Sequence, residues 1–199
     1  MKKALILTIT LCAAILLSGP DVSAADKIMP HPHIEVITSE GTFKIELVTK
    51  EAPKTVAHIL RLVDDGFYDG LIFHRVIAGF MVQTGGYTPG FKLREDDKSV
   101  INESGNSLSN ARGTIAMART DDPHSANSQF FINVVDNQRL DPQKSTVSGR
   151  WGYTVFGYVF EGMEVVDKIA AAQTSPQGEH QNAPLIPIVI KKMAQISYD

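Results

Sequence analysis

Residues 73–83 read FHRVIAGFMVQ, and this stretch guides the interpretation of the rest of the chain. In an extended strand, alternate side chains lie on one face, so Arg75 reaches residues 80–83 only if the chain bends near Gly79. An isolated arginine usually lies on the surface, where its stem covers apolar neighbours and its charge stays in water. The stretch therefore predicts two short strands joined by a tight turn, with a cation beside an apolar cluster.

Short β-type runs continue on both sides of this stretch. Residues 34–47 alternate apolar and polar side chains around Gly41, which predicts a β-hairpin. Further runs rich in β-branched and aromatic residues are bounded by Gly, Asp, Asn or Ser. They lie at residues 71–77, 80–83, 114–118, 130–135, 154–160 and 187–197. The pattern therefore predicts eight strands.

Two other stretches have helical periodicity. Residues 53–66 place Val56, Ile59 and Val63 on one face, and residues 162–172 have a similar pattern. Eight strands are about the number that closes a barrel whose interior is filled by its own side chains, and closure removes exposed edges. We therefore predict a mainly β fold, a closed eight-stranded antiparallel barrel capped by two α-helices.

The first 25 residues are typical of a secretory signal peptide. Two lysines precede an apolar run of 14 residues, and small residues follow near Ala24 and Ala25, where we expect cleavage. Because a bilayer span needs about 20 apolar residues, we expect no stable membrane insertion after cleavage. Cleavage also removes Cys12, the only cysteine, and leaves residues 26–199 as one domain without thiols. Such a domain suits an oxidising compartment.

Composition and charge exclude two further classes of protein. The chain has 199 residues, of which 43% are hydrophobic, so it can fill a core and is not a disordered chain. Its formal net charge of −3 argues against a nucleic-acid-binding protein, which usually has a basic patch. The signal peptide and the absence of thiols after cleavage predict a location in the periplasm, with full secretion as the alternative.

Three segments together resemble the cyclophilin family of peptidyl-prolyl cis-trans isomerases, and most closely its exported bacterial members. They are residues 73–83, GTIAMART at 113–120 and SQFFINV at 128–134, within a resemblance that runs from about 33 to 196. The fold of this family, an eight-stranded barrel with two helices, agrees with the pattern above. The resemblance implies an enzyme that rotates X–Pro bonds in exported or unfolded polypeptides and assists their folding. It implies no cofactor and no metal.

Each position that matches a family motif takes the family's role. Arg75 matches the catalytic arginine, and Gln83 matches the glutamine that orients the arginine and the substrate backbone. His74 lies beside the arginine and takes a supporting role in substrate binding. The residues that match the apolar pocket for the proline ring are Phe80, Met81, Phe131 and Leu140. The residues that match the groove are Ala118 and Gln129. Tyr153 stands where many relatives have His, and it can still donate a hydrogen bond from the rim of the pocket.

The reaction explains why these residue types are sufficient. Rotation about a peptide bond faces a barrier of about 18–20 kcal/mol because resonance resists twisting. No bond is broken, so the reaction needs no nucleophile, metal or proton shuttle. A guanidinium that bonds the prolyl carbonyl and approaches the nitrogen stabilises the twisted amide more than the planar one, and only such a difference accelerates the reaction.

One position departs from the family pattern. Arg139 occupies a position where relatives commonly have Trp or another aromatic residue, on which cyclosporin binding in the family depends. We therefore expect weak cyclosporin binding and less effect on peptide turnover. Residues 142–152 form a connection longer than usual, which contains Trp151, the only tryptophan. The expected partners are proline-containing polypeptides, and we expect a monomer.

Three other functions are compatible with parts of the sequence. His31 and His33, or paired aspartates in polar loops, could suggest a metal site, but their spacing fits no common ligand set. Asp121, His124 and Ser128 have the residue types of a hydrolase triad but lack its sequence context. The strongest alternative is a cyclophilin-like module that holds proline segments as a chaperone with little turnover. Arg75 favours the enzyme, because a binding module does not need this arginine.

Overall fold

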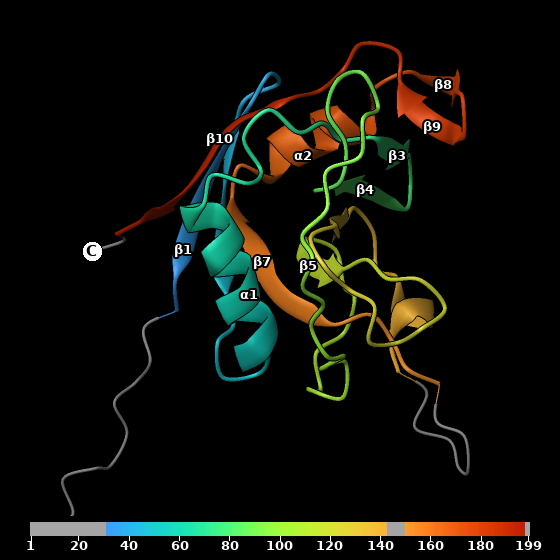
Figure 1. The fold of residues 1–199 in the computed structure, drawn as a ribbon. Helices are drawn as coiled ribbons and strands as arrows, with labels where there is room; N and C mark the ends of the chain where they lie inside the picture. The colour runs from blue at the N-terminus through green and yellow to red at the C-terminus, as the bar shows by residue number, and fades with distance from the viewer. Residues whose placement is uncertain (1–30, 143–149, 198–199) are drawn as a thin grey trace, which may run out of the picture.

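The computed structural model describes residues 31–142 and 150–197 (Figure 1). The strands in these residues are β1 (His33–Thr38), β2 (Thr42–Leu47), β3 (Arg75–Ile77), β4 (Met81–Thr84), β5 (Thr114–Met117), β6 (Phe130–Asn133), β7 (Val155–Glu161), β8 (Thr174–Gln177), β9 (His180–Pro184) and β10 (Ile190–Ile196). The helices are α1 (Pro53–Asp64), α2 (Met163–Ala170) and the short 3-10 helix η1 (Gln138–Leu140). The predicted signal peptide at 1–25 lies outside the described residues, as does most of the 142–152 connection.

Eight strands form one antiparallel sheet in the order β10-β1-β2-β7-β5-β6-β4-β3, which confirms the mainly β fold. The prediction of a closed barrel overstates the closure, because the described parts of the edge strands β3 and β10 share no ladder. A single bridge joins Ile72 to Val189, and the Phe73 amide donates to the Ile188 carbonyl at 2.9 Å. The positive φ of Gly70, 82°, turns the chain out of the extended conformation just before this bridge. The sheet is therefore a half-barrel whose two edges are joined by a few backbone hydrogen bonds.

The two α-helices form where the periodicity predicts them. Pro53 occupies the first turn of α1, where its missing N–H costs nothing, and Val56 and Ile59 are buried on its apolar face. The chain leaves α1 at Gly66, whose φ is 64°. In α2, Val166 and Ile169 are buried in the same core. Helix α1 packs against β10, and α2 packs against β2, β3 and β4 (Figure 1).

The sheet has a separate apolar cluster on each face. Along β6, Phe130 lies in the main core with a relative exposure of 1%, and Phe131 lies on the opposite face with 4%. The same alternation in β4 separates Val82 in the main core from Met81 on the opposite face. The main core includes buried residues of both α-helices, whereas the second cluster consists of Met81, Ala116, Phe131 and Val155. This second cluster is the floor of the candidate site.

A small hairpin, β8–β9, is absent from the sequence prediction. Its strands have almost no apolar alternation and include Pro176, so the period-2 signal on which the prediction relies is missing. Gly178, with φ 59°, lies in the turn. The hairpin contacts β3, and Figure 1 shows it at the β3–β4 end of the molecule. In the described residues, none of the helices has the length and hydropathy needed to span a membrane.

Candidate active site

The β3–β4 hairpin places Arg75 directly opposite Gln83. The two residues are partners in the antiparallel register, and the chain reverses through Gly79, whose φ is 68°. The Phe80 amide donates to the Ile77 carbonyl at 3.1 Å, which closes the turn. The Arg75 Nη1 then donates to the Gln83 Oε1 at 3.2 Å. The bend predicted from the sequence is therefore present, and it brings the cation beside residues 80–83.

A line of polar side chains continues from Arg75 across the sheet. The Gln83 side chain accepts from the arginine through its oxygen and donates through its Nε2 to the Gln129 Oε1 at 3.0 Å. In the register of β4 and β6, Gln83 lies opposite Phe131. Because both ends of the Gln83 amide are bonded, its oxygen is held toward the guanidinium, and the exposed arginine side chain has a fixed anchor.

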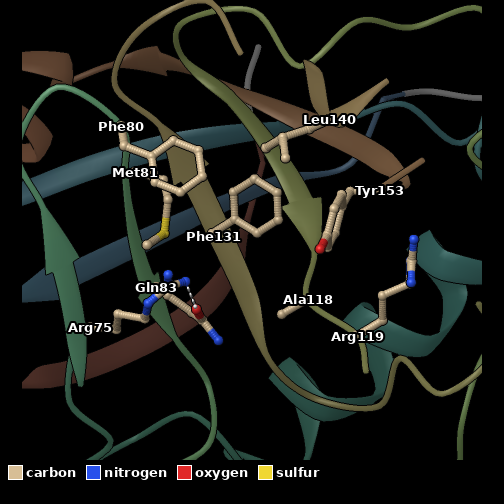
Figure 2. A pocket seen from close by; sticks show the side chains of 9 residues that line it. All are labelled: Arg75, Phe80, Met81, Gln83, Ala118, Arg119, Phe131, Leu140 and Tyr153. Carbon is tan, nitrogen blue, oxygen red and sulfur yellow. Dashed lines mark hydrogen bonds between the residues drawn. The ribbon is translucent and has the colours of Figure 1, made fainter. Parts of the chain in front are cut away.

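An apolar cavity of about 390 Å³ opens beside this polar line. Its lining residues are Arg75, Phe80, Met81, Gln83, Ala118, Arg119, Phe131, Leu140 and Tyr153 (Figure 2). The Phe131 and Tyr153 rings meet edge to face with centroids 5.5 Å apart. Figure 2 shows Phe80 and Leu140 on the side of the pocket opposite Gln83 and Ala118. The cavity suits a small apolar ring, and the hydrogen-bonded pair of Arg75 and Gln83 lies at one side of it.

Leu140 is held in the pocket wall by a partly buried network around Asp141. The Asp141 carboxylate accepts from the Ser109 hydroxyl at 2.5 Å and from the Asn110 amide N–H at 2.7 Å. On the opposite side, the Tyr153 amide donates to the Leu140 carbonyl at 3.0 Å. This network has no signal in the sequence, because its members are polar residues in irregular segments that only the fold brings together.

Two further arginines lie at the edge of the pocket. Arg119 donates to the carbonyls of Thr120, Trp151 and Gly152 at 2.7–3.3 Å, and its guanidinium carbon lies 4.7 Å from the Tyr153 ring centroid. The guanidinium carbon of Arg139 lies 4.4 Å from the Phe80 ring centroid. Arg139 is thus adjacent to a pocket wall, at the position where the family pattern has an aromatic residue.

The sequence-predicted residues divide between this pocket and two adjoining hollows. Gln129 lines a second, polar hollow of about 270 Å³ together with Gln83, Glu95 and Ala118. His74 is buried behind Arg75 and lines a third hollow of about 410 Å³. All the other predicted site residues line the apolar pocket itself. The sequence analysis did not identify Tyr87 and His180 as neighbours of His74, with centroids 4.7 and 5.9 Å away.

Burial lowers the pKa of His74 to about 4, and the nearby charges of His180 and Arg75 act in the same direction. Its Nδ1 is buried and has no hydrogen-bond partner among the described residues. His74 is therefore neutral at neutral pH. It packs against Tyr87 behind the arginine and carries no charge that would compete with it.

We expect acid to destabilise the protein through His74. The unfolded state binds a proton near pH 6.5 and the folded state only near pH 4, so the free energy of unfolding falls as the pH is lowered through this range. The loss for this group is about 3 kcal/mol. Urea unfolding at pH 7, 5.5 and 4 measures it, with His74→Phe as the control that keeps a ring but cannot titrate. Parallel pH dependences for the two proteins would contradict the assignment.

The alternative chemical sites are not assembled in the described structure. The Ser128 hydroxyl is buried and donates to the Gly85 carbonyl at 2.8 Å, while the His124 Nδ1 accepts from the Asn102 amide at 3.1 Å, so no Ser–His pair forms. His31 and His33 both contact Glu46 instead. Residues 31–142 and 150–197 contain no group of three or more His, Cys, Asp or Glu side chains that could share a metal ion.

Comparisons with known proteins identify the family. The profile of the family described as "Cyclophilin type peptidyl-prolyl cis-trans isomerase/CLD" matches residues 33–195. The chain is 49% identical to the peptidyl-prolyl cis-trans isomerase cyp18 of Streptomyces antibioticus over 79% of its own length and 95% of the relative. It is 47% identical to peptidyl-prolyl cis-trans isomerase B of Escherichia coli (strain K12), over 78% of its own length and 94% of the relative.

Solved structures show the same fold. A crystal structure of a cyclophilin type peptidyl-prolyl cis-trans isomerase from Cryptosporidium parvum has a TM-score of 0.69 and 25% identity, and covers 85% of this chain and 99% of that protein. A second structure of that protein, in the presence of the dipeptide Ala-Pro, has a TM-score of 0.67, 26% identity and coverages of 83% and 99%. The sequence and structural matches agree with each other and with the pocket geometry. The chain therefore belongs to the cyclophilin-type peptidyl-prolyl cis-trans isomerases, and the reaction that it catalyses is the rotation of X–Pro peptide bonds.

Proposed function

We propose that Arg75 is the catalytic cation and that the apolar pocket holds the proline ring while the acyl side of the X–Pro bond turns. The guanidinium of Arg75 donates a hydrogen bond to the prolyl carbonyl and approaches the prolyl nitrogen. As the amide twists, the nitrogen lone pair is no longer shared with the carbonyl and becomes a better acceptor. The cation therefore stabilises the twisted state more than the planar one. Gln83 orients the guanidinium, and Phe131 and Met81 hold the ring.

The observation that carries this proposal is the Arg75–Gln83 hydrogen bond at the edge of the apolar cavity. The reaction needs a positioned cation and an apolar site for the proline ring, and this arrangement has both. The Cryptosporidium parvum relative was solved in the presence of Ala-Pro, which supports a proline-containing ligand for this chain. No side chain in the pocket has to act as a nucleophile or a base.

The size of the required acceleration is compatible with this arrangement. Uncatalysed X–Pro exchange takes tens to hundreds of seconds, so a millisecond reaction needs about 6–7 kcal/mol of transition-state stabilisation. One preorganised donor supplies about 2.7–4 kcal/mol in the comparable case of an oxyanion hole. Immobilising the ring and excluding water from the amide supply the remainder. An isomerisation assay on a prolyl peptide tests the proposal. A module that only binds would show saturable binding and no acceleration.

We also propose that the protein works in the periplasm, on exported or unfolded polypeptides whose folding it assists. The support is the N-terminal charge pattern, the apolar run and the small residues near Ala24. When the full-length chain is expressed in a Gram-negative host, we expect to recover the protein from the periplasmic fraction. Its mass should correspond to cleavage after Ala24 or Ala25. A Leu11→Arg variant, which interrupts the apolar run, should stay in the cytoplasm at full length. Recovery of the uncleaved wild-type chain in the cytoplasm would contradict the proposal.

Weak cyclosporin binding and a monomeric state belong to the same proposal. The cation of Arg139 lies over Phe80 where the family pattern has an aromatic ring. A large apolar ligand that packs against the aromatic ring of the family pattern loses this contact area here, and it meets a hydrated charge instead. Titration with cyclosporin should therefore give weaker binding to the wild type than to an Arg139→Trp variant, and sedimentation at micromolar concentration checks the monomer.

A further inference from the structure

The described residues that line the proline pocket carry positive charge and no negative charge. Two of the pocket's lining residues, Arg75 and Arg119, are cationic, and none is an aspartate or glutamate. Arg139 adds a third cation against the outer side of Phe80, 4.4 Å from the ring centroid. The protein as a whole has a formal net charge of −3, so this local excess of positive charge is a property of the site and not of the surface in general.

Arg139 differs from Arg61 and Arg112 in its charged partners. Arg61 forms ion pairs with Asp65 and Asp96, and Arg112 pairs with Asp167 at 2.8 Å. Within 31–142 and 150–197, Arg139 has no ion pair. The adjacent segment 143–149, QKSTVSG, contains no acidic residue that could supply one. A cation–π contact leaves the guanidinium edge free to donate, so Arg139 can bind an anion without breaking an existing pair.

The geometry of the pocket indicates which part of a substrate passes Arg139. The X–Pro amide lies at Arg75, and the polar hollow lined by Ala118 and Gln129 gives room for the turning residue before the proline. The residue after the proline is attached to the immobilised ring. We place it along Phe80 and Leu140, which lie on the side of the pocket opposite Gln83 and Ala118 (Figure 2). This is the side on which Arg139 lies, because it stacks on Phe80.

Arg119 does not fill the same role, although it lines the pocket. Its guanidinium already donates to the carbonyls of Thr120, Trp151 and Gly152. These bonds hold the backbone that leads into Tyr153, so the donors of Arg119 are occupied. Its positive charge still adds to the electrostatic potential at the pocket. Arg75 is engaged by Gln83 and by the reacting amide. None of the described residues accepts a hydrogen bond from Arg139, so it is the cation beside the pocket that can still bind an anion.

From these observations we infer that Arg139 is a specificity-determining residue that favours substrates with a carboxylate on the residue directly after the proline. The inference rests on the proposed placement of the proline ring and of Arg75. An exposed ion pair contributes a factor of up to about five in binding. Because the charges are exposed, the preference should weaken as salt shortens the screening length from about 10 Å at 0.1 M to about 3 Å at 1 M.

The test compares peptides that differ only in charge. The peptides are Ala-Ala-Pro-Glu and Ala-Ala-Pro-Gln, blocked at both ends, with Glu-Ala-Pro-Gln as the positional control. For the wild type in low salt, we expect kcat/KM to be about three- to fivefold higher for Ala-Ala-Pro-Glu than for Ala-Ala-Pro-Gln. Arg139→Gln should reduce this ratio to less than half, and Arg139→Lys should retain most of it. Lys191→Gln, which removes an exposed charge on β10 away from the pocket, should leave the ratio unchanged.

Three results would overturn the inference. They are a wild-type ratio of one in low salt, a ratio that Arg139→Gln leaves unchanged, and a preference confined to Glu-Ala-Pro-Gln. Turnover of the neutral Ala-Ala-Pro-Gln peptide reports the proposed function separately, since it involves no charge on the substrate. If the wild type bound this peptide without turning it over, the proposed function would fail. The ratio of the Kd values for the glutamate and glutamine peptides would then decide the role of Arg139.

Discussion

The Arg75→Ala variant is expected to lower kcat/KM for a prolyl tetrapeptide by about a hundredfold or more, which corresponds to the loss of one preorganised donor. The reason is that Arg75 is the one cation that both lines the pocket and is hydrogen-bonded to Gln83. Without it, the pocket still binds the proline ring, but it no longer distinguishes the twisted amide from the planar one. A protease-coupled or NMR isomerisation assay measures the change.

Controls separate this effect from a loss of fold. Arg75 is exposed, so its truncation should change the free energy of unfolding by less than about 0.5 kcal/mol. Arg75→Lys keeps a charge but loses the planar fork that bonds Gln83 and the carbonyl together, so we expect an intermediate rate. Gln83→Ala removes the hydrogen bond that orients the Arg75 guanidinium but leaves the guanidinium itself in place. We expect this variant to lower the rate by about tenfold. Equal rates for wild type and Arg75→Ala would support the binding-module alternative.

The second large effect is expected at Phe131, and its neighbour Phe130 provides a matched control. Both are nearly fully buried on β6, but Phe130 faces the main core and Phe131 faces the pocket. Truncation of either to Ala should lower the free energy of unfolding by about 3–5 kcal/mol. Only Phe131→Ala should also weaken peptide binding, by roughly tenfold, because the proline ring loses the apolar surface that covers it.

Urea unfolding measures the stability of both variants, and titration with a non-turnover prolyl peptide measures binding by the folded protein. If the alanine variants unfold at the working temperature, Phe130→Leu and Phe131→Leu make the same comparison with smaller cavities. Equal losses of peptide affinity in the two variants would mean that Phe131 acts only through stability. The pocket assignment would then be wrong.

The sequence was sufficient for most of the fold because most elements bury a periodic apolar face. The hairpin at β1–β2, the helix α1 and the strands β4 to β6 all have this signal, and all lie where it predicts. The β8–β9 hairpin has no such signal, because its strands lack a periodic apolar face. The extent of closure was overestimated because alternation predicts strands and not which edges pair. The short β3 strand and the single Ile72–Val189 bridge depend on local turns such as the one at Gly70.

The candidate site was predictable to the extent that it lies in continuous motifs. Arg75 and Gln83 are eight residues apart on one hairpin, and a bend between them is sufficient to bring them together. The Asp141 network and the Tyr87–His74–His180 cluster could not be predicted in this way. Their members come from separate segments of the chain and have no periodicity. The stacking of Arg139 on Phe80 was also not predictable, although the unusual residue type at this position was visible in the sequence.

The most direct test of the account separates binding from rotation on the enzyme. NMR exchange spectroscopy on a saturating prolyl peptide gives the cis–trans exchange rate of the bound state, and titration of the same sample gives Kd. For Arg75→Ala, the account predicts an on-enzyme rate about a hundredfold lower and a Kd within about threefold of the wild type, because Arg75 acts on the twisted amide. A Kd about a hundredfold weaker with an unchanged on-enzyme rate would contradict it.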